Sequence, residues 1–280
     1  YYDANNVQLS TKVDEIDSED VAAKYRAWGW DVIEIDGHDI DQIRAALTTA
    51  NAATEKPTLI VGHTIMGKGL VTAEGESFED KVSTHGQPVS AAGASLEATI
   101  KHLGGDAENP FQIFPEVAEL YAARAEALRA EMVERKAVEA EWRRTNSVLA
   151  HKLDMFLSNE LPEIDYRSVG IKSGSATRAA SAAVLGVYAE QVENMIVASA
   201  DLSNSDKTDG FLKKTHAFKR GDFSGKFFQA GVSEFTMACV MNGMALHGGV
   251  IPACGTFFVF SDYMKPVVRL SALMGLHVIY

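Results

Sequence analysis

The chain has 280 residues and a formal net charge of −12 at pH 7, from 26 Lys and Arg against 38 Asp and Glu. This acidic balance argues against a nucleic-acid backbone or an anionic membrane surface as the main partner. The most apolar stretch, Val250 to Phe260, is 11 residues long, whereas a membrane-spanning helix needs about 20 residues. The composition, 46% hydrophobic and 23% charged, is that of a globular protein with room for more than one domain.

Helix and strand signals alternate along the first part of the chain. A helix is predicted from Ser18, which acids follow, to about Trp28. Strands are predicted over Asp31–Ile35 and Thr58–Val61. Between them, apolar residues at spacings of 3, 4 and 3 indicate one face of a helix: Ile40, Ile43, Leu47 and Ala50. This order predicts a parallel α/β layout.

The middle of the chain changes character. From Gly67 to Pro88 it is polar and punctuated by glycines, and a loop longer than about 12–15 residues is usually functional or disordered. Residues 116–144 are rich in Ala, Glu and Arg without a helix breaker, which predicts one long, solvated helix.

The second part of the chain restarts the alternation of helices and strands. A buried strand is predicted over Met195–Ser199 and another from Ile251 onward. The predicted helices are Thr177–Tyr188, Glu234–Leu246 and Lys265–Met274.

Two features concern thiols and chain ends. The two cysteines, Cys239 and Cys254, have apolar neighbours, which suits buried thiols in a reducing cytoplasm better than a disulfide framework or a metal site. The apolar run Leu276 to Tyr280 is β-rich and no turn residue follows it. Because natural termini usually fall in exposed polar segments, we expect a piece of a longer chain.

Two asparagines, Asn5 and Asn6, stand near the start of the chain. In the run Asp3 to Val7, the Asn5 side chain and free backbone carbonyls offer the oxygen ligands that a hard cation such as Mg²⁺ prefers. The alternative is an ordinary turn, in which Asn is common.

Two histidines differ in their surroundings. His85 lies near the end of the long polar loop, between Thr84 and Gly86, where an imidazole is free to titrate or donate. The alternative is a surface histidine without a role. His38 stands just before a predicted helix, and we expect it to cap or pack.

Polar residues follow the predicted strand that ends at Ser199. The run Ser199 to Ser205 stands where ligands bind in open α/β sheets, at the carboxyl end of a strand. Its hydroxyls and amides can bond a phosphate or a sugar. The alternative is a polar cap in front of a helix.

Glu234 begins a predicted helix among Val, Phe, Met and Ala. A carboxylate in apolar surroundings is paired with a cation or has a raised pKa, which suits proton donation near neutrality. The alternative is an acid stabilised by the helix dipole.

Phe257, Phe260 and Tyr263 recur every three residues, on one face of a helical turn. Such a face can stack on a flat heterocycle or belong to the core.

The order and spacing of these segments resemble transketolase over essentially the whole of residues 1–280. The stretch Met66–Gly69 with Phe78–Gly86 is similar to a loop of the bacterial form of that family. So is Gly231–Phe235 with Leu246–Gly249.

The resemblance implies an α/β fold of two thiamine-diphosphate-binding-type parallel-sheet domains, the first one incomplete, joined by a long helical linker. The implied divisions are 1–110 for the carboxyl-terminal part of the diphosphate-binding domain, 111–162 for the linker and 163–280 for the pyrimidine-binding domain.

The implied cofactors are thiamine diphosphate and Mg²⁺, with Ca²⁺ or Mn²⁺ able to replace the latter. The Asn5 side chain and the Val7 carbonyl match the metal ligands of the family. His85 matches the histidine that approaches both cofactor and sugar phosphate. Arg178 and Ser205 match the residues that grip the substrate phosphate, a task for which a guanidinium fork is suited.

Further roles follow from the same resemblance. Glu234 matches the glutamate that shares a proton with the aminopyrimidine ring and so promotes deprotonation of the thiazolium carbon. Phe260 matches the aromatic residue that stacks on the pyrimidine. The other implied cofactor contacts are Asp201, Leu202, Phe257 and Tyr263.

The implied reaction moves a two-carbon ketol unit from a ketose phosphate to an aldose phosphate through a thiamine diphosphate carbanion, in the pentose phosphate pathway of the cytoplasm. A homodimer with the cofactor at the subunit interface is implied, and no nucleic-acid or membrane partner is expected. Alternatives are dihydroxyacetone synthase or 1-deoxyxylulose-5-phosphate synthase on the same fold, and a non-catalytic, truncated binding chain.

The sequence also departs from the family pattern. A Gly-Asp-Gly with a further metal ligand is expected before Tyr1, and more substrate-binding residues and a third domain are expected beyond Tyr280. His63 stands where lysine is common, which we expect to be neutral. We therefore expect the 280 residues to be inactive on their own.

Overall fold

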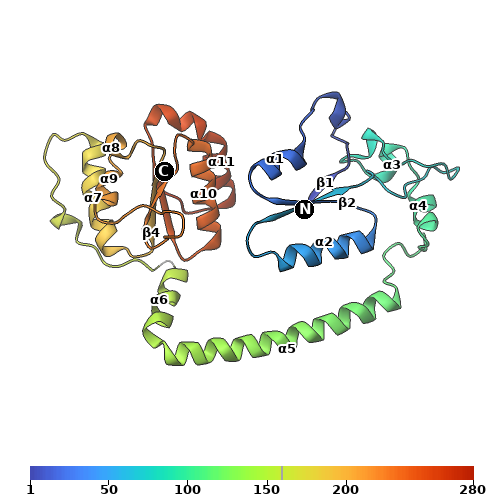
Figure 1. Cartoon of the computed structure of the whole chain (residues 1–280), viewed down its shortest axis with the longest axis horizontal. Coiled ribbons are helices and arrows are strands. Elements are labelled where there is room, and N and C mark those ends of the chain that lie inside the picture. The colour runs from blue at the N-terminus through green and yellow to red at the C-terminus, as the bar shows by residue number, and fades with distance from the viewer. Residues whose placement is uncertain (159) are drawn as a thin grey trace. The chain divides into compact units, whose positions relative to one another are not determined.

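A computed structural model describes residues 1–158 and 160–280 (Figure 1). The chain divides into two compact units, a first unit of Tyr1–Glu126 and a second unit of Ala127–Tyr280. Each unit holds a three-stranded sheet whose strands are all parallel. The α/β fold with two parallel sheets, predicted from the sequence, is confirmed.

The sheet of the first unit has the order β1-β3-β2. Its central strand β3 (Thr58–His63) pairs with β1 (Tyr2–Ala4) and with β2 (Asp31–Asp36). Helices α1 (Val21–Ala27) and α2 (Ile40–Ala52) lie on opposite sides of this sheet (Figure 1). Carboxyl ends of all three strands therefore meet at one edge, where ligands bind in open α/β sheets.

Helix α1 starts later than the sequence predicted. Asp20, and not Ser18, occupies the cap position, and its side chain accepts a hydrogen bond of 2.8 Å from Ala23 N. Asp and Ser are equally good caps, so the sequence pattern did not decide between them.

The buried face of α2 agrees with the predicted one in part. Ile43 and Ala50 pack against the cluster of Ile35, Ala46 and Ile60, as predicted, and Ala46, which was not predicted, is 3% exposed. Ile40 and Leu47, which the periodicity placed on the apolar face, are exposed. The small side chain of Ala46 lets the helix approach the strands closely, so the helix turns this residue inward.

Between β3 and the long helix the chain is mostly irregular. The predicted loop contains one turn of 3₁₀-helix, η2 (Val82–Thr84), and two short helices follow it, α3 (Val89–Ala92) and α4 (Leu96–His102). Another 3₁₀ turn, η1 (Val13–Glu15), precedes α1.

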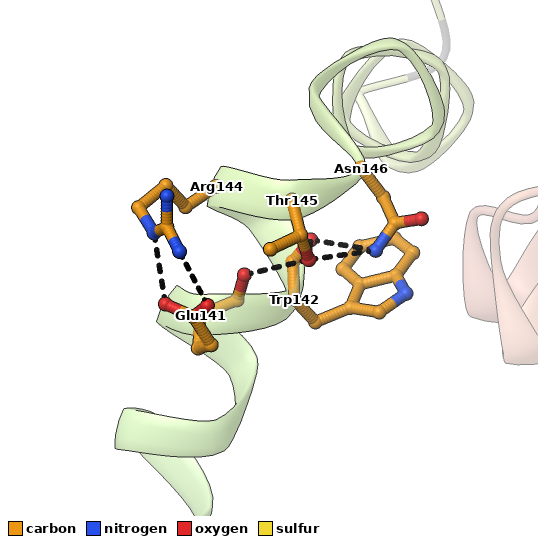
Figure 2. A network of polar contacts seen from close by, with 5 residues as sticks. All are labelled: Glu141, Trp142, Arg144, Thr145 and Asn146. Atoms are coloured by element: carbon orange, nitrogen blue, oxygen red, sulfur yellow. Dashed lines mark hydrogen bonds and ion pairs between the residues drawn. The ribbon is translucent and has the colours of Figure 1, made fainter.

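The predicted long helix is α5 (Pro115–Thr145), and no residue in it is buried. Its end is closed by side chains, as Figure 2 shows. Thr145 Oγ1 donates to Glu141 O at 2.9 Å, and Asn146 Nδ2 donates to Trp142 O at 3.0 Å. The Trp142 carbonyl also accepts the ordinary backbone bond from Asn146 N at 2.8 Å, so the side chains add bonds to the last helical turn before α6 (Ser147–Leu157) begins.

The sheet of the second unit has the order β5-β4-β6. The central strand β4 (Met195–Ser199) pairs with β5 (Phe227–Gln229) and β6 (Ile251–Gly255). Strand β5 was not predicted from the sequence. The helical segments that follow α6 in this unit are η3 (Tyr166–Ser168), α7 (Thr177–Gln191), α8 (Ser203–Asp206), α9 (Asp209–Leu212), α10 (Glu234–His247), η4 (Phe258–Tyr263) and α11 (Lys265–Met274).

Side chains of the second sheet alternate between two buried clusters. Val197 points to the cluster that contains Phe211 of α9 and Phe227 of β5. The next residue, Ala198, belongs to the cluster that contains Met237 and Met241 of α10. Figure 1 shows the corresponding helices on the two sides of β4, α7 to α9 on one and α10 and α11 on the other. Because strand residues alternate, each face gains its own core.

The β-rich run at the chain end forms no strand in the described residues; Ile279 makes a single bridge to Ala253 of β6. One further prediction needs correction. Cys254 is buried as predicted, and burial raises the pKa of its thiol to about 12. Cys239, predicted to be buried, is exposed, because it lies on a face of α10 turned away from the sheet. No helix among the described residues is long and apolar enough to cross a membrane.

Candidate active site

A hollow of about 620 Å³ lies at the carboxyl end of the second sheet. It is lined by segments that follow β4 and β5 and by η4. Five residues that the sequence singled out meet here: Asp201, Leu202, Glu234, Phe260 and Tyr263. They come from positions up to 62 residues apart, so the fold brings together what the sequence keeps separate.

Glu234 is the first residue of α10 and is only 8% exposed. In the described part of the chain its carboxylate has no ion-pair partner, so pairing with a cation, one of the alternatives that the sequence left open, is not found. It stands where the free N–H groups of a helix start favour a negative charge. The carboxylate lines the hollow and is available to a group with an N–H donor.

Three aromatic residues, Phe257 just before η4 and Phe260 and Tyr263 within it, form a row. Ring centroids are 6.2 Å apart for Phe257 and Phe260 and 6.3 Å for Phe260 and Tyr263, both pairs with planes at 21°. A 3₁₀-helix has three residues per turn, so side chains at i and i+3 lie above one another. The spacing of three that suggested a helical face therefore has its basis in a 3₁₀-helix and not in an α-helix.

Phe257 lies at the edge of a second hollow, of about 560 Å³, which Arg178 and Thr256 also line. Arg178 Nη1 donates to Ser205 O at 3.2 Å. The two residues expected to grip a phosphate are thus in contact. In the described residues Arg178 has no carboxylate partner, which leaves its guanidinium open to an anion.

Thr256 was not singled out from the sequence. Its Oγ1 is buried and has no hydrogen-bond partner among the described residues. Its position directly after β6, at the carboxyl end of a strand, is a signal that could have drawn attention to it.

The polar run after β4 does not cap a helix. The cap position of α8 belongs to Leu202, whose side chain makes no cap hydrogen bond, and Ser199 Oγ accepts a hydrogen bond of 3.2 Å from Leu202 N. The expected polar N-cap residue is therefore not found at this position. Asp201 adopts a positive φ of 62°, which is uncommon for a residue other than glycine and marks a tight turn.

In the first unit, Asn5 and Val7 follow β1. Val7 N donates to Asn5 Oδ1 at 2.9 Å, and Asn5 Nδ2 donates to Asp3 Oδ2 at 3.2 Å. Asn6 has a positive φ of 56°, so the segment is a turn stabilised by an Asn side chain. The same turn holds the Asn5 amide in one orientation, with Oδ1 next to the backbone at Val7.

His85 follows the 3₁₀ turn η2. Its side chain is half-buried, and Nδ1 is buried without a partner among the described residues. A buried polar atom normally has a partner, so this nitrogen is available to a ligand. His38 differs: its Nε2 accepts a hydrogen bond of 2.8 Å from Ile65 N, which gives it a structural role.

Protein side chains alone supply few metal ligands. No group of three or more His, Cys, Asp or Glu residues that could hold a metal lies within the described residues. A cation at Asn5 and Val7 would need further oxygens from a bound ligand or from other chain segments.

Known proteins match both units. Residues 1–162 match the family model "Transketolase, thiamine diphosphate binding domain", and residues 173–280 match "Transketolase, pyrimidine binding domain". A transketolase of Bacillus subtilis is 37% identical over all of this chain, and one of Halalkalibacterium halodurans is 36% identical. The chain spans 41% of the length of each of these two relatives.

Solved structures agree with the sequence matches. A transketolase from Leishmania mexicana superposes with a TM-score of 0.87 at 26% identity and covers 100% of this chain and 41% of that one. A transketolase from Pichia stipitis in complex with sedoheptulose 7-phosphate superposes with a TM-score of 0.84 at 28% identity, over 99% and 41% of the two chains.

Proposed function

The chain belongs to the transketolase family, and we propose that the protein of which it is part transfers a two-carbon ketol unit from a ketose phosphate to an aldose phosphate. The observation that carries this proposal is the hollow where the buried Glu234 carboxylate meets the aromatic row at Phe260. A carboxylate beside flat rings suits an aromatic heterocycle with N–H donors.

The residues fit thiamine diphosphate. When bound, this cofactor supplies the thiazolium carbon that carries the two-carbon unit. Glu234 would accept a hydrogen bond from the pyrimidine ring and hold or release a proton there. Phe260 and Tyr263 would contact the ring, and Asp201 and Leu202 would line the rest of the hollow.

In the first unit, Asn5 Oδ1 and the Val7 carbonyl would ligate Mg²⁺, which binds the cofactor diphosphate. The pre-formed turn at Asn5 supports this role, since it fixes the amide orientation before any ion arrives. The unpartnered Nδ1 of His85 supports a contact with cofactor or sugar.

Substrate recognition belongs to the segment around Arg178. Its guanidinium, open to an anion and bonded to Ser205 O, would bind the phosphate of the sugar. A phosphate contact favours phosphorylated sugars over free ones. Activity profiling across ketose and aldose phosphates separates ketol transfer from the reactions of related enzymes on this fold.

Wider features are proposed on the family resemblance. They are a homodimer with the cofactor at the interface between subunits, a place in the pentose phosphate pathway of the cytoplasm, and divisions at 1–110, 111–162 and 163–280. The net charge of −12 supports the absence of a nucleic-acid partner.

The test is an assay of ketol transfer by the complete protein, with thiamine diphosphate and Mg²⁺ added. Glu234→Gln keeps the shape but removes the acid, and we expect activity to fall by about 10²–10⁴-fold, the usual size of acid–base catalysis. Glu190→Gln is the matched control, because Glu190 pairs with Lys214 on the surface of the same unit.

Two results would contradict the proposal. One is a wild-type protein, folded and supplied with both cofactors, that transfers no ketol unit. The other is a Glu234→Gln variant as active as the Glu190→Gln control. Circular dichroism of both variants shows whether the fold is retained.

A further inference from the structure

Asp206, at the end of α8, accepts three hydrogen bonds of 2.8 Å each. Its Oδ2 accepts from Ser199 Oγ, at the carboxyl end of β4, and its Oδ1 accepts from the backbone N and from Oγ1 of Thr208. Ser199 is 0% exposed and Thr208 is 6% exposed. Hydrogen bonds to an ionised acceptor are the strong ones, so this carboxylate ties the strand end to the start of α9.

The bonds of Asp206 close a loop over residues 199–206. Inside this loop Ser199 Oγ also accepts a hydrogen bond of 3.2 Å from Leu202 N. Asp201, inside the loop, has a φ of 62°, and Lys207, directly after the loop, has a φ of 73°; both lie in the left-handed region. Such backbone conformations persist where the surroundings hold them, and the Asp206 carboxylate bonds to residues on both sides of this segment, Ser199 before it and Thr208 after it.

The segment around Asp206 also lies beside Arg178, and both residues line the second hollow. Ser205, the neighbour of Asp206 in the chain, accepts the hydrogen bond from Arg178 of α7. Helix α9, whose start Asp206 holds through Thr208, packs on α7 so closely that a Cβ on Gly210 would lie 2.3 Å from Ala182 O. Helix α7, which carries Arg178, therefore contacts this region twice, through the bond from Arg178 to Ser205 O and through its packing on α9.

We propose that Asp206 is a positioning residue that sets the cofactor side and the substrate side of the site at once. Its two carboxylate oxygens are bonded to Ser199 and Thr208, and the residue also lines the hollow of Arg178. Asp206 holds Asp201 and Leu202 toward the hollow of Glu234, and Ser205 toward Arg178, through one rigid loop. This inference rests on the proposed function for its ligands, but the geometry of the loop stands independently of it.

The experiment compares variants of the complete protein. Asp206→Ala is expected to raise the Kd of thiamine diphosphate and the KM of the ketose phosphate together by about tenfold or more, since misplacement by about 1 Å can cost up to about 100-fold. Asp206→Asn keeps one acceptor oxygen and is expected to recover part of both losses. A role in folding alone would lower the amount of active protein and leave Kd and KM unchanged.

The matched control is Asp222→Ala. Asp222 accepts hydrogen bonds from Ser224 N and Ser224 Oγ, at 3.1 Å and 2.6 Å, in the same pattern as Asp206 with Thr208 but in a different loop. We expect this variant to change Kd and KM by less than about twofold. Ser199→Ala added to Asp206→Ala is expected to have no further effect, because residues in one network are not additive.

Hydrogen exchange separates this proposal from the proposed function. If the wild-type protein transfers no ketol unit, the proposed function fails, and exchange of the 199–208 amides in Asp206→Ala still tests the loop. Faster exchange there, with the rest of the unit unchanged, supports the positioning role. Unchanged exchange, or a Kd and KM that shift no more than in Asp222→Ala, overturns it.

Discussion

The two units contain sheets with the same number of strands, but the hydrophobic cores that pack against these sheets differ. Each sheet has three parallel strands. In the second unit buried clusters cover both faces of β4, and Phe211, Phe227 and Met237 are 0% exposed. In the first unit the cluster under α2 consists of Ile35, Ala46 and Ile60 with partly buried neighbours.

The candidate site residues of the two units differ in the same way, in how firmly the surrounding structure holds them. Glu234 starts a helix whose inner face is core, whereas Asn5 and His85 lie on loops shaped by single hydrogen bonds and one 3₁₀ turn. Packed elements hold side chains more precisely than loops do. We therefore expect the candidate residues of the second unit to be held rigidly and those of the first unit to be ordered by their ligands.

The largest expected effect tests the difference in cores. Phe211→Ala removes a fully buried ring of α9 and is expected to cost about 3–5 kcal/mol of the free energy of unfolding. The matched change in the first unit is Phe78→Ala, a half-buried ring, for which we expect about 1 kcal/mol. Chemical denaturation of the complete chain measures both. Equal losses would contradict the contrast between the units.

A second prediction concerns the thiols of the second unit. Burial raises the pKa of Cys254 from 9.0 to about 12, so at pH 8 it holds about a thousandfold less thiolate than an unperturbed thiol. Because thiolate is the nucleophile, alkylation of Cys254 should be negligible at pH 8 and increase as the pH rises. Exposed Cys239 should react first. Mass spectrometry after timed alkylation checks this, and equal rates at the two cysteines would show that the core opens freely.

The smallest expected effect concerns the aromatic row. Phe260→Ala should weaken binding of thiamine diphosphate by about 2- to 12-fold, the equivalent of about 0.5–1.5 kcal/mol for an aromatic contact. Phe258→Ala is the control, since Phe258 belongs to the same 3₁₀-helix but is 93% exposed. Fluorescence titration with the cofactor measures both variants, and an equal effect at Phe258 would remove the stacking role from Phe260.

The sequence predicted the elements that have strong local signals. Strand β4 and helix α11 have the predicted bounds, and α5 differs by one residue at each end. Strand β5 was missed because three residues carry too little pattern on their own and become a strand only by pairing with β4. The inward turn of Ala46 in α2 likewise depends on the sheet beneath it.

The sequence also predicted those residues of the candidate site that stand at positions with a strong local signal. Asp201, Glu234 and Phe260 stand next to strand ends or helix starts, which the sequence pattern locates, and the resemblance to a family ordered them. Thr256 and Asp206 were missed because their roles depend on tertiary contacts, an unpartnered buried hydroxyl in one case and a bond to Ser199 in the other.

We expect the two units to have different roles in cofactor binding, Mg²⁺ ligation at Asn5 and a contact with the pyrimidine ring at Glu234. Calorimetric titration of thiamine diphosphate into the complete protein, with and without Mg²⁺, tests these roles most directly. We predict that wild-type binding depends on Mg²⁺, that Asn5→Ala loses this dependence, and that Glu234→Gln binds more weakly but keeps it. Binding to the wild type that is indifferent to Mg²⁺, or an Asn5→Ala variant with the full dependence, would contradict the account.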